Sequence, residues 1–453
     1  MLALAACGTV PAQHAKTAVA KTTPTRPAPA KTGRLPGGSC PTPSPRYAWA
    51  VELTTNGRMA WTTSLPTRNV AYSSAVEPVT VGAVALFAQD GIVYGLEAAN
   101  GHRLWSWAGG QSVYGMWRDG GLVAVLTDQV SDHARLTGLD AATGAVRWSL
   151  RLPRNGLYGG QALTADGGLA MVVAGGVRQR GILQVVNLAD GRIRWQRSTG
   201  ASAALVAADG MVIFGINGGL TGYDDRTGQP RWTIARGLPQ GPDAQLAGGL
   251  VLLNSNVQGP GIPNTLTAVI PATGRIAWRF NPGAPVTVLS VGPAGLSLAT
   301  YDPARLYLLD PRTGRPRWHA DTTVSYGTIP LITKTAVIST ESTQSANSDG
   351  GIVEHVSLVD RAAANGRAQW QDALPQQPDA PQQVIQAGPL ALQQGNPAGR
   401  AQAPALLSAY QLTSGRLAWR ADLPAFVALA PVPVPDGILV QPADSTYECA
   451  LAG

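Results

Sequence analysis

The chain has 453 residues, of which 13% are charged, and it carries a net charge of +7 at neutral pH. Six positive charges lie in one N-terminal segment that has no acidic residue, so the basic balance does not indicate a folded nucleic-acid-binding domain. No run reaches the roughly 18 apolar residues of a membrane-spanning helix, which excludes a helical transmembrane segment.

The first seven residues end in Leu4-Ala5-Ala6-Cys7. This small-residue pattern precedes the modified cysteine of a bacterial lipoprotein, where a lipid is attached to the thiol. The basic region and most of the apolar region of a secretory signal are missing upstream. We therefore interpret residues 1–7 as a truncated lipoprotein signal and expect a lipid on Cys7. A chance alanine-rich start is the alternative.

Residues 8–46 are rich in Pro, Ala, Thr and Lys, and they contain no aromatic residue. Such a segment cannot bury enough apolar surface to offset its chain entropy, so we expect a disordered tether. Its basic residues suit attraction to anionic lipid or a wall polymer, although solvated charge without a partner explains them equally well. These residues are Lys16, Lys21, Arg26, Lys31, Arg34 and Arg46.

A short motif repeats along the rest of the chain: a glycine is followed four residues later by a tryptophan. The interval between successive motif tryptophans runs from 37 residues (Trp195 to Trp232) to 52 residues (Trp318 to Trp370). A fixed motif at a variable period indicates stacked copies of one supersecondary unit, with insertions in its loops. The pairs are Gly57/Trp61, Gly101/Trp105, Gly144/Trp148, Gly191/Trp195, Gly228/Trp232, Gly274/Trp278, Gly314/Trp318, Gly366/Trp370 and Gly415/Trp419.

Each motif is interpreted as a hairpin turn between two strands. The best copies begin at Asp140, Asp224 and Asp310 and read Asp-x-x-Thr-Gly-x-x-x-Trp. The residue before each glycine is a type that favours turns, and the glycine itself tolerates a positive φ. We expect the tryptophan on the outgoing strand to pack between neighbouring units. A platform for stacking a sugar or other ligand is the alternative.

Two further strands are predicted upstream of each motif hairpin. In the shortest interval these are Ala203–Ala207 and Met211–Phe214, followed by Leu220–Tyr223 and the motif turn. Four strands in about 45 residues make one blade of a β-propeller. No interval shows a helical period. The sequence therefore predicts an all-β fold, a single closed propeller of four-stranded blades.

With this motif the chain resembles the quinoprotein-type (PQQ-like) β-propeller superfamily over residues 47–453. Its layout of anchor, tether and one propeller resembles BamB-type envelope lipoproteins. Catalytic quinoproteins hold their cofactor against adjacent cysteines and a calcium bound by carboxylates. This chain lacks adjacent cysteines, so we carry over the fold and expect no cofactor or catalytic metal. Individual copies depart from the motif at Glu97, Asn187, Ile270 and Gln411, and the eighth has an extra residue between Asp360 and Gly366.

The ends of the repeat array raise the question of closure. Strand candidates after Trp419, including Gly437–Val440, are expected to pair with the hairpin around Gly57. The motif count then gives nine blades, whereas the resemblance implies eight, and the sequence leaves this open. Once Cys7 carries lipid, Cys40 and Cys449 are the remaining cysteines, and they bracket the array. We expect a disulfide between them, with two free thiols as the alternative.

Other chemical motifs are missing from the sequence. The five histidines lie far apart, and there is no phosphate-binding loop or zinc pattern. Two polar segments, residues 340–351 and 371–404, are long for the repeat. Long loops on a rigid scaffold are frequent binding sites, with insertion drift as the competing explanation.

These features favour a non-catalytic, monomeric lipoprotein on the outer side of the bacterial cell membrane. Its propeller would bind an envelope protein or a wall polymer, and not nucleic acid. Two alternatives stay open. One is an enzyme, either a quinone-dependent dehydrogenase or a propeller lyase that acts on sugars. The other is an extracytoplasmic sensor domain of the kind that is fused to kinases.

Overall fold

The computed structural model of the protein divides into two units, residues 1–44 and 45–453. All residues that the structure describes belong to the second unit. They are residues 47–66, 76–127, 134–152, 164–166, 169–174, 181–199, 204–216, 219–235, 238, 244–254, 265–324, 328–346, 352–374, 384–395, 406–422, 431–434 and 437–441. The predicted signal, the tether and all three cysteines, Cys7, Cys40 and Cys449, lie outside these residues.

The described part of the chain consists of strands joined by turns, as the sequence predicts. In the first half the strands are β1 (Tyr47–Thr54), β2 (Met59–Pro66), β3 (Val76–Val81), β4 (Val84–Gln89), β5 (Ile92–Glu97), β6 (Arg103–Ala108), β7 (Val113–Asp119), β8 (Leu122–Thr127), β9 (Arg135–Asp140), β10 (Val146–Arg151), β11 (Thr164–Asp166), β12 (Leu169–Ala174), β13 (Gly181–Asn187), β14 (Ile193–Thr199), β15 (Ala204–Ala208), β16 (Met211–Ile216), β17 (Gly219–Asp224) and β18 (Pro230–Ile234).

In the second half they are β19 (Ala244–Ala247), β20 (Leu250–Asn254), β21 (Leu266–Val269), β22 (Ile276–Phe280), β23 (Val286–Gly292), β24 (Gly295–Tyr301), β25 (Ala304–Leu309), β26 (Pro316–Asp321), β27 (Thr323–Val324), β28 (Leu331–Ile332), β29 (Ala336–Ala346), β30 (Ile352–Ala362), β31 (Ala368–Ala373), β32 (Ile385–Ala387), β33 (Leu390–Gly395), β34 (Leu406–Gln411), β35 (Leu417–Asp422), β36 (Val432–Val434) and β37 (Gly437–Val440). No helix among the described residues is long and apolar enough to cross a membrane.

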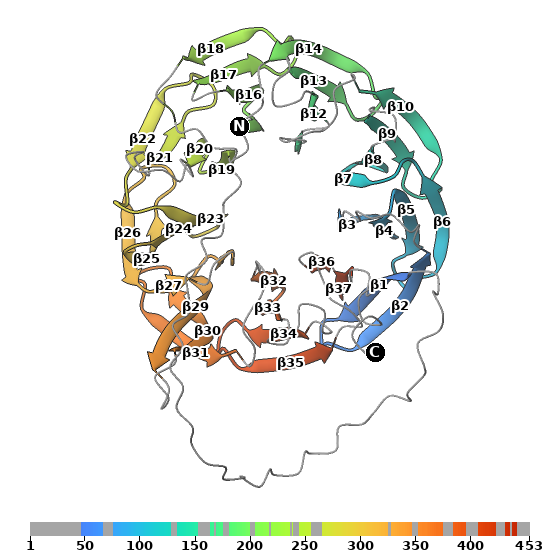
Figure 1. The fold of residues 1–453 in the computed structure, drawn as a ribbon. Helices are drawn as coiled ribbons and strands as arrows, with labels where there is room; N and C mark the ends of the chain where they lie inside the picture. Colours follow the sequence, from blue (N-terminus) through green and yellow to red (C-terminus); the bar gives the residue numbers. More distant parts are fainter. Residues whose placement is uncertain are drawn as a thin grey trace, which may run out of the picture. The chain divides into compact units, whose positions relative to one another are not determined.

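The described strands form nine small antiparallel sheets, which we call blades 1 to 9. Within the second unit the blades follow one another around a ring (Figure 1), with β3 toward the centre and β6 at the outside of its blade. Blade 1 combines β36, β37, β1 and β2; blades 2 to 7 are β3–β6, β7–β10, β11–β14, β15–β18, β19–β22 and β23–β26; blade 8 is β27–β31, and blade 9 is β32–β35. The predicted all-β propeller is thus confirmed, and the sheets number nine.

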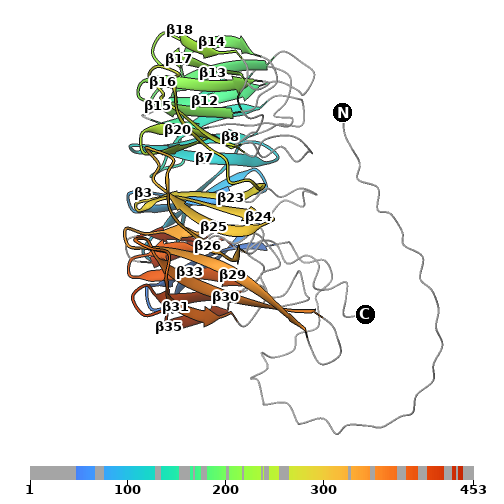
Figure 2. The same cartoon turned by 90° about the vertical axis from the view of Figure 1, so that its left-hand side faces the viewer.

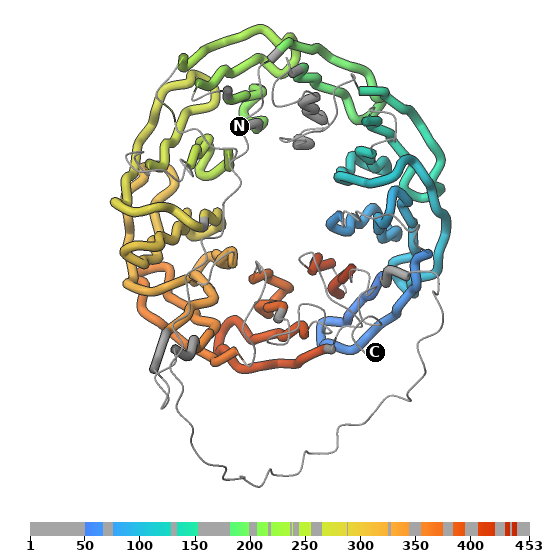
Figure 3. The backbone as a smooth tube through the Cα atoms, in the orientation of Figure 1, coloured from blue at the N-terminus to red at the C-terminus, as the bar shows by residue number. Residues whose placement is uncertain are grey.

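The first and last strands of the array meet in one sheet. Val51 on β1 pairs with Val440 on β37, and Thr54 pairs with Gly437. Figure 3 shows this junction, where the red end of the described chain lies against the blue beginning. The predicted pairing of Gly437–Val440 with the N-terminal hairpin is therefore confirmed. Elsewhere, the described strand ladders run within blades and not from one blade to the next.

The core lies between the faces of adjacent blades. The four-stranded pattern places apolar residues of the second and third strands inside. For example, Phe87 and Tyr94 of blade 2 pack with Ala50, Leu65 and Leu439 of blade 1. Each blade thus buries a face on the next, as expected for a repeat that cannot form a core alone.

Blade 8 differs from the others in the length of its central hairpin. β29 and β30 have 11 residues each, and Figure 2 shows them running beyond the neighbouring strands of the ring. The predicted polar loop at 340–351 is therefore wrong in part, since Thr340–Ala346 continues β29. Of these residues, Thr340, Glu341 and Ser342 are buried within the blade, whereas Thr343 is exposed. Similarly, β32 and β33 occupy part of the predicted loop at 371–404.

Candidate functional site

The motif tryptophans join each blade to the next. In all nine motifs the indole N–H donates to a backbone carbonyl in the motif turn of the following blade. The nine bonds are 2.7 to 3.2 Å long. They run from Trp61 to Ala98, Trp105 to Ala141, Trp148 to Leu188, Trp195 to Asp225, Trp232 to Pro271, Trp278 to Pro311, Trp318 to Ala363, Trp370 to Leu412 and Trp419 to Thr55. The last of these bonds, from blade 9 to blade 1, completes the circle.

The motif glycines receive those indole rings. A Cβ on Gly366 would lie 2.7 Å from the Trp318 ring, so only glycine lets the ring approach. The φ of this residue is 73°, a conformation that glycine adopts without steric cost. The same contact recurs with Gly57, Gly101, Gly144, Gly191, Gly228, Gly274, Gly314 and Gly415. The motif glycines and tryptophans therefore serve the packing between blades.

The acidic residue that opens the intact motifs organises its own turn. The Asp140 carboxylate accepts the Thr143 N–H at 3.0 Å and Arg147 Nη2 at 2.7 Å. The hydrogen bond from Arg147 is the largest cause that lowers the pKa of Asp140 to about 2. Asp224 is held in the same way by Arg231 and Thr227, and its pKa is also lowered. These carboxylates serve turn structure.

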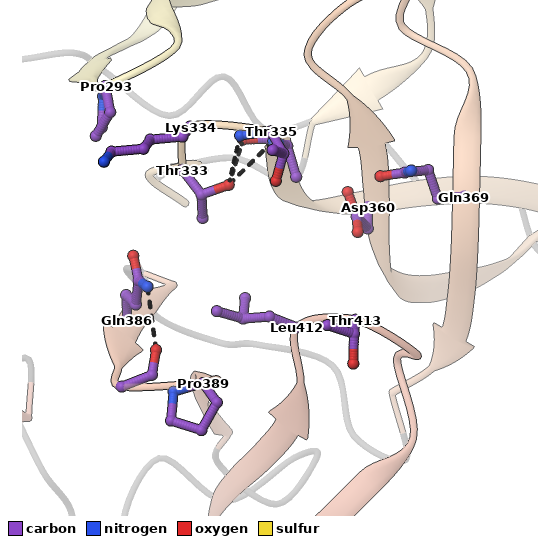
Figure 4. Close-up of a pocket in the computed structure, with 12 residues that line it drawn as sticks. Pro293, Thr333, Lys334, Thr335, Asp360, Gln369, Gln386, Pro389, Leu412 and Thr413 are labelled. Carbon is purple, nitrogen blue, oxygen red and sulfur yellow. Dashed lines mark hydrogen bonds between the residues drawn. The ribbon is translucent and has the colours of Figure 1, made fainter.

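A pocket of about 650 Å³ lies between blades 8 and 9. Its walls come from turns that are distant in sequence, as Figure 4 shows. Thr333, Lys334 and Thr335 form the turn between β28 and β29, Ala336 begins β29, and Asp360 comes from β30. The remaining lining residues are Pro293, Gln369, Gln386, Gly388, Pro389, Leu412 and Thr413.

Asp360 is the buried ionisable group of this pocket. The residue is 2% exposed, and its Oδ1 atom has no hydrogen-bond partner among the described residues. Burial raises the pKa of Asp360 to about 6, opposed by a hydrogen bond from Trp370. A carboxyl group that is removed from water favours its neutral form until a donor or cation compensates its charge. Such a group is a candidate for ligand binding.

The structure corrects the motif assignment of Asp360. The first position of the eighth motif is Ala362, whose N–H donates to Arg367 O and whose carbonyl accepts the Gly366 N–H. Asp140 makes the equivalent bonds in blade 3. Asp360 lies two residues earlier, directly opposite Trp370 in the ladder. In the other copies the first motif position lies four residues before the glycine. The same count from Gly366 gives Ala362, so Asp360 lies outside the turn.

The repeat itself does not require an acid opposite the motif tryptophan. Seven blades have a glycine or an aliphatic residue there, namely Gly95, Gly138, Val185, Gly222, Ala268, Leu308 and Ala409. Blade 1 has Glu52, whose Oε2 accepts the Trp61 N–H at 2.5 Å. Asp360 differs because it also borders a cavity.

A buried ion pair lies in the same blade. Arg361 donates to Glu341 through Nε at 2.8 Å and Nη2 at 2.7 Å. Thr322 and Ser339 add hydroxyl donors to the same carboxylate. The hydrogen bond with Glu341 raises the pKa of Arg361. With its donors in place, this pair stiffens the base of the long hairpin.

The far end of that hairpin leaves the sheet. β27 pairs with β29 only as far as Ser342, and β31 pairs with β30 only from Ser357. Residues 343–346 and 352–355 pair with each other. We call these two segments the ribbon. Among the described residues, neither Thr343–Ala346 nor Ile352–Glu354 pairs with a third strand.

The candidate metal and disulfide residues give no further site in the described part of the chain. No group of three or more His, Cys, Asp or Glu is placed there to hold a metal ion. His102, His319 and His355 lie in three different blades, whereas His14 and His133 fall outside the described residues.

A family profile and solved structures resemble this chain. The profile of the family described as outer membrane protein assembly factor BamB matches residues 107–257, 263–392 and 353–450. A eukaryotic initiation factor superposes with a TM-score of 0.56 at 11% identity, over 84% of this chain and 96% of that chain. BamB from Moraxella catarrhalis gives a TM-score of 0.41 at 16% identity, over 68% of this chain and 90% of that chain. These structural likenesses concern the fold alone.

One curated relative is a serine/threonine-protein kinase, AfsK from Streptomyces griseus. It is 28% identical over 163 residues, which are 34% of this chain and 20% of the kinase. The chain thus spans about a fifth of the length of that relative. The family profile, by contrast, covers more than half of this chain. The protein therefore belongs to the BamB family, within the PQQ-like β-propeller superfamily.

Proposed function

We propose that the protein is a non-catalytic scaffold of the bacterial cell envelope, which binds a partner protein through its propeller. The family's description as an assembly factor for outer membrane proteins supports a role in handling other proteins. The nine tryptophan–glycine contacts favour a rigid ring of blades, which could hold binding elements in fixed positions. The observation that carries the proposal is the ribbon of blade 8.

The ribbon offers the chemistry of strand addition. A strand edge without a partner presents a row of backbone N–H and C=O groups. An extended peptide can pair with such an edge, and side chains of alternate residues then supply specificity. The ribbon has two such edges, and the Glu341–Arg361 pair holds its base. We therefore propose that the protein partner binds to the ribbon. The crosslinking test below distinguishes this partner from a wall polymer.

Replacing residues 343–355 with an Asn-Gly turn is expected to abolish partner binding and leave the melting temperature nearly unchanged. The described ladder in this range joins the end of β29 only to the beginning of β30, whereas the blade core remains. A photo-crosslinker at Thr343 in intact cells should capture a protein, and mass spectrometry would identify it. Thr233, an exposed threonine on β18 of blade 5, is the matched control position. Equal capture at both positions, or capture of wall polymer only, would contradict a protein partner on the ribbon.

We further propose that the chain is anchored by lipid on Cys7 and that Cys40 and Cys449 form a disulfide. Leu4-Ala5-Ala6-Cys7 and the pairing of the first and last strands support these two modifications. An exported domain lies where disulfides persist, and a bridge across so long a loop chiefly restricts the unfolded state.

Peptide mapping of protein from the membrane fraction of cells, with a full upstream signal supplied, is expected to find both modifications. Cys7 should carry the lipid, and a Cys40–Cys449 crosslink should disappear on reduction. Cys7→Ser should release the protein from membranes. Membrane association that survives this substitution, or two free thiols in the mapped peptides, would remove the corresponding part of the proposal.

The match to the kinase AfsK favours a second candidate function, an extracytoplasmic sensor domain. A sensor requires a ligand site, and the pocket between blades 8 and 9 would supply one. Capture of a protein at Thr343 supports the scaffold, whereas ligand binding without any captured protein supports the sensor.

A further inference from the structure

We propose that the pocket between blades 8 and 9 binds a small zwitterion, an amino acid or a short peptide, whose ammonium group donates to Asp360. This inference is independent of the partner on the ribbon, because the two sites use different residues. It begins with the Oδ1 atom of Asp360, which is buried and has no hydrogen-bond partner among the described residues. Buried acceptors without a donor are rare and destabilising in native proteins.

Most blades do without an acid at this position, and Glu52 of blade 1, which accepts the Trp61 N–H, is the other acid found there. Asp360 occupies the place opposite a motif tryptophan where seven other blades have glycine or an aliphatic residue. Trp370 already has a backbone acceptor, Leu412 O, at 3.2 Å. A hydrogen bond from Trp370 also reaches the Asp360 carboxyl group, so it is the Oδ1 atom that is left without a donor. The carboxylate borders a volume of about 650 Å³, within the range of small-molecule sites.

The charges of the pocket select the ligand class. Asp360 and Lys334 are the charged residues among those that line it. The turn from β28 to β29 carries Lys334 at the rim, directed away from Asp360 (Figure 4). A cationic donor compensates a buried carboxylate more fully than a neutral hydroxyl does. An ammonium group therefore suits Asp360, and a carboxylate at the other end of the ligand suits Lys334.

The remaining lining residues suit the peptide-like body of such a ligand. Thr333 accepts backbone N–H groups of its own turn, and Gln386 donates to Gly388 O at 3.0 Å. These two side chains are thus fixed in place. Gln369 lies beside Asp360 in the close-up view (Figure 4) and supplies an amide. Leu412 and Pro389 provide an apolar wall.

Calorimetric titration of the full chain tests this proposal with three probes: alanyl-alanine, its N-acetyl derivative and its C-terminal amide. Alanyl-alanine is expected to bind. The N-acetyl derivative, which has no ammonium, should bind at least about tenfold more weakly. The amide should lose less, because Lys334 is exposed at the rim and its charge is screened.

Variants assign the contact to Asp360. Asp360→Asn should weaken alanyl-alanine binding about as much as acetylation does, and it should remove the difference between the two probes. Asp372→Asn is the matched control, because Asp372 is a carboxylate on β31 of the same blade that does not line the pocket. Gln369→Ala, at an exposed position on β31, should weaken binding by a smaller factor.

The affinity should also depend on pH in the wild type. Because the pKa of Asp360 is about 6, about a tenth of the protein is ionised there at pH 5 and nearly all at pH 7.5. Affinity for alanyl-alanine should therefore rise about tenfold across this range, while Asp360→Asn should show a flat profile. The α-amino group of alanyl-alanine, with an ordinary pKa of about 7.7–8.0, stays mostly protonated up to pH 7.5, so its own titration reduces this rise by less than about twofold.

Three results would overturn the inference. They are no binding of alanyl-alanine at millimolar concentration, equal binding of the N-acetyl derivative, and unchanged affinity in Asp360→Asn. If Asp360→Asn fails to fold, the carboxyl carbon of Asp360 can be followed by NMR in the wild type. Saturation with alanyl-alanine should lower the pKa of this group, and an unchanged pKa would contradict the proposed contact.

Discussion

Replacing Trp318 with alanine is expected to lower the free energy of unfolding by about 3–5 kcal/mol, the range for truncation of a buried aromatic residue. Trp318 is 8% exposed and packs with Leu306, Leu308 and Ala363. Its indole N–H donates to Ala363 O at 3.0 Å. The substitution removes the ring that joins blade 7 to blade 8, so it leaves a cavity and a carbonyl without its donor.

Chemical denaturation followed by tryptophan fluorescence would measure this loss. Trp117→Ala is the matched control, because Trp117 lies on β7 outside the motif and is only partly buried. The loss at Trp117 should be clearly smaller. Similar small losses at both tryptophans would refute a joining role for the motif residue.

Removing the arginine of the buried ion pair, Arg361→Ala, is expected to destabilise the protein by about 3–5 kcal/mol. Glu341 is 6% exposed, and the substitution leaves its carboxylate with two hydroxyl donors and no cation. A buried charge that has lost its partner is costly, whereas replacing both charged residues with apolar ones costs much less stability. The double variant Glu341→Leu with Arg361→Met should therefore recover most of the lost stability.

An exposed pair gives the comparison for this measurement. Arg147 and Asp140 also form a short ion pair, 2.7 Å between Nη2 and Oδ2, but the arginine side chain is 59% exposed. Arg147→Ala should have little effect, since solvent screens surface pairs. A loss at Arg361 no larger than the loss at Arg147 would show that the pair in blade 8 adds nothing to the fold.

Much of the fold could be predicted because its information is local. A glycine that adopts a positive φ, a turn-forming neighbour and a tryptophan four residues later specify one hairpin, whatever the rest of the chain does. Each interval then has room for two further strands. Ala203–Ala207 and Met211–Phe214 were predicted in this way, and they correspond to β15 and β16. The spacing alone therefore identified the blade.

The long hairpin of blade 8 could not be predicted in the same way. Thr340–Ala346 is polar, and polar runs of serine and threonine are as typical of loops as of exposed strands. It forms a strand because it pairs with Ile352–Leu358 of β30. The glycine–tryptophan motif lies outside both segments and does not specify this pairing. The sequence shows that residues 340–351 exceed the ordinary repeat, but only the pairing of β29 with β30 makes Thr340–Ala346 a strand.

The candidate site shows the division most clearly. By itself, the sequence determined the family of folds, the nine hairpins and the acidic turns, because each depends on residues within one interval. The tertiary structure decided that blade 1 contains both ends of the array and that Asp360 faces a pocket built from turns far apart in the chain. Burial depends on which blade becomes the neighbour, and that is fixed only when Trp370 reaches Leu412 of blade 9. A carboxyl group that looks like part of a turn in the sequence thus becomes, through packing, a buried group with one oxygen, Oδ1, left without a donor.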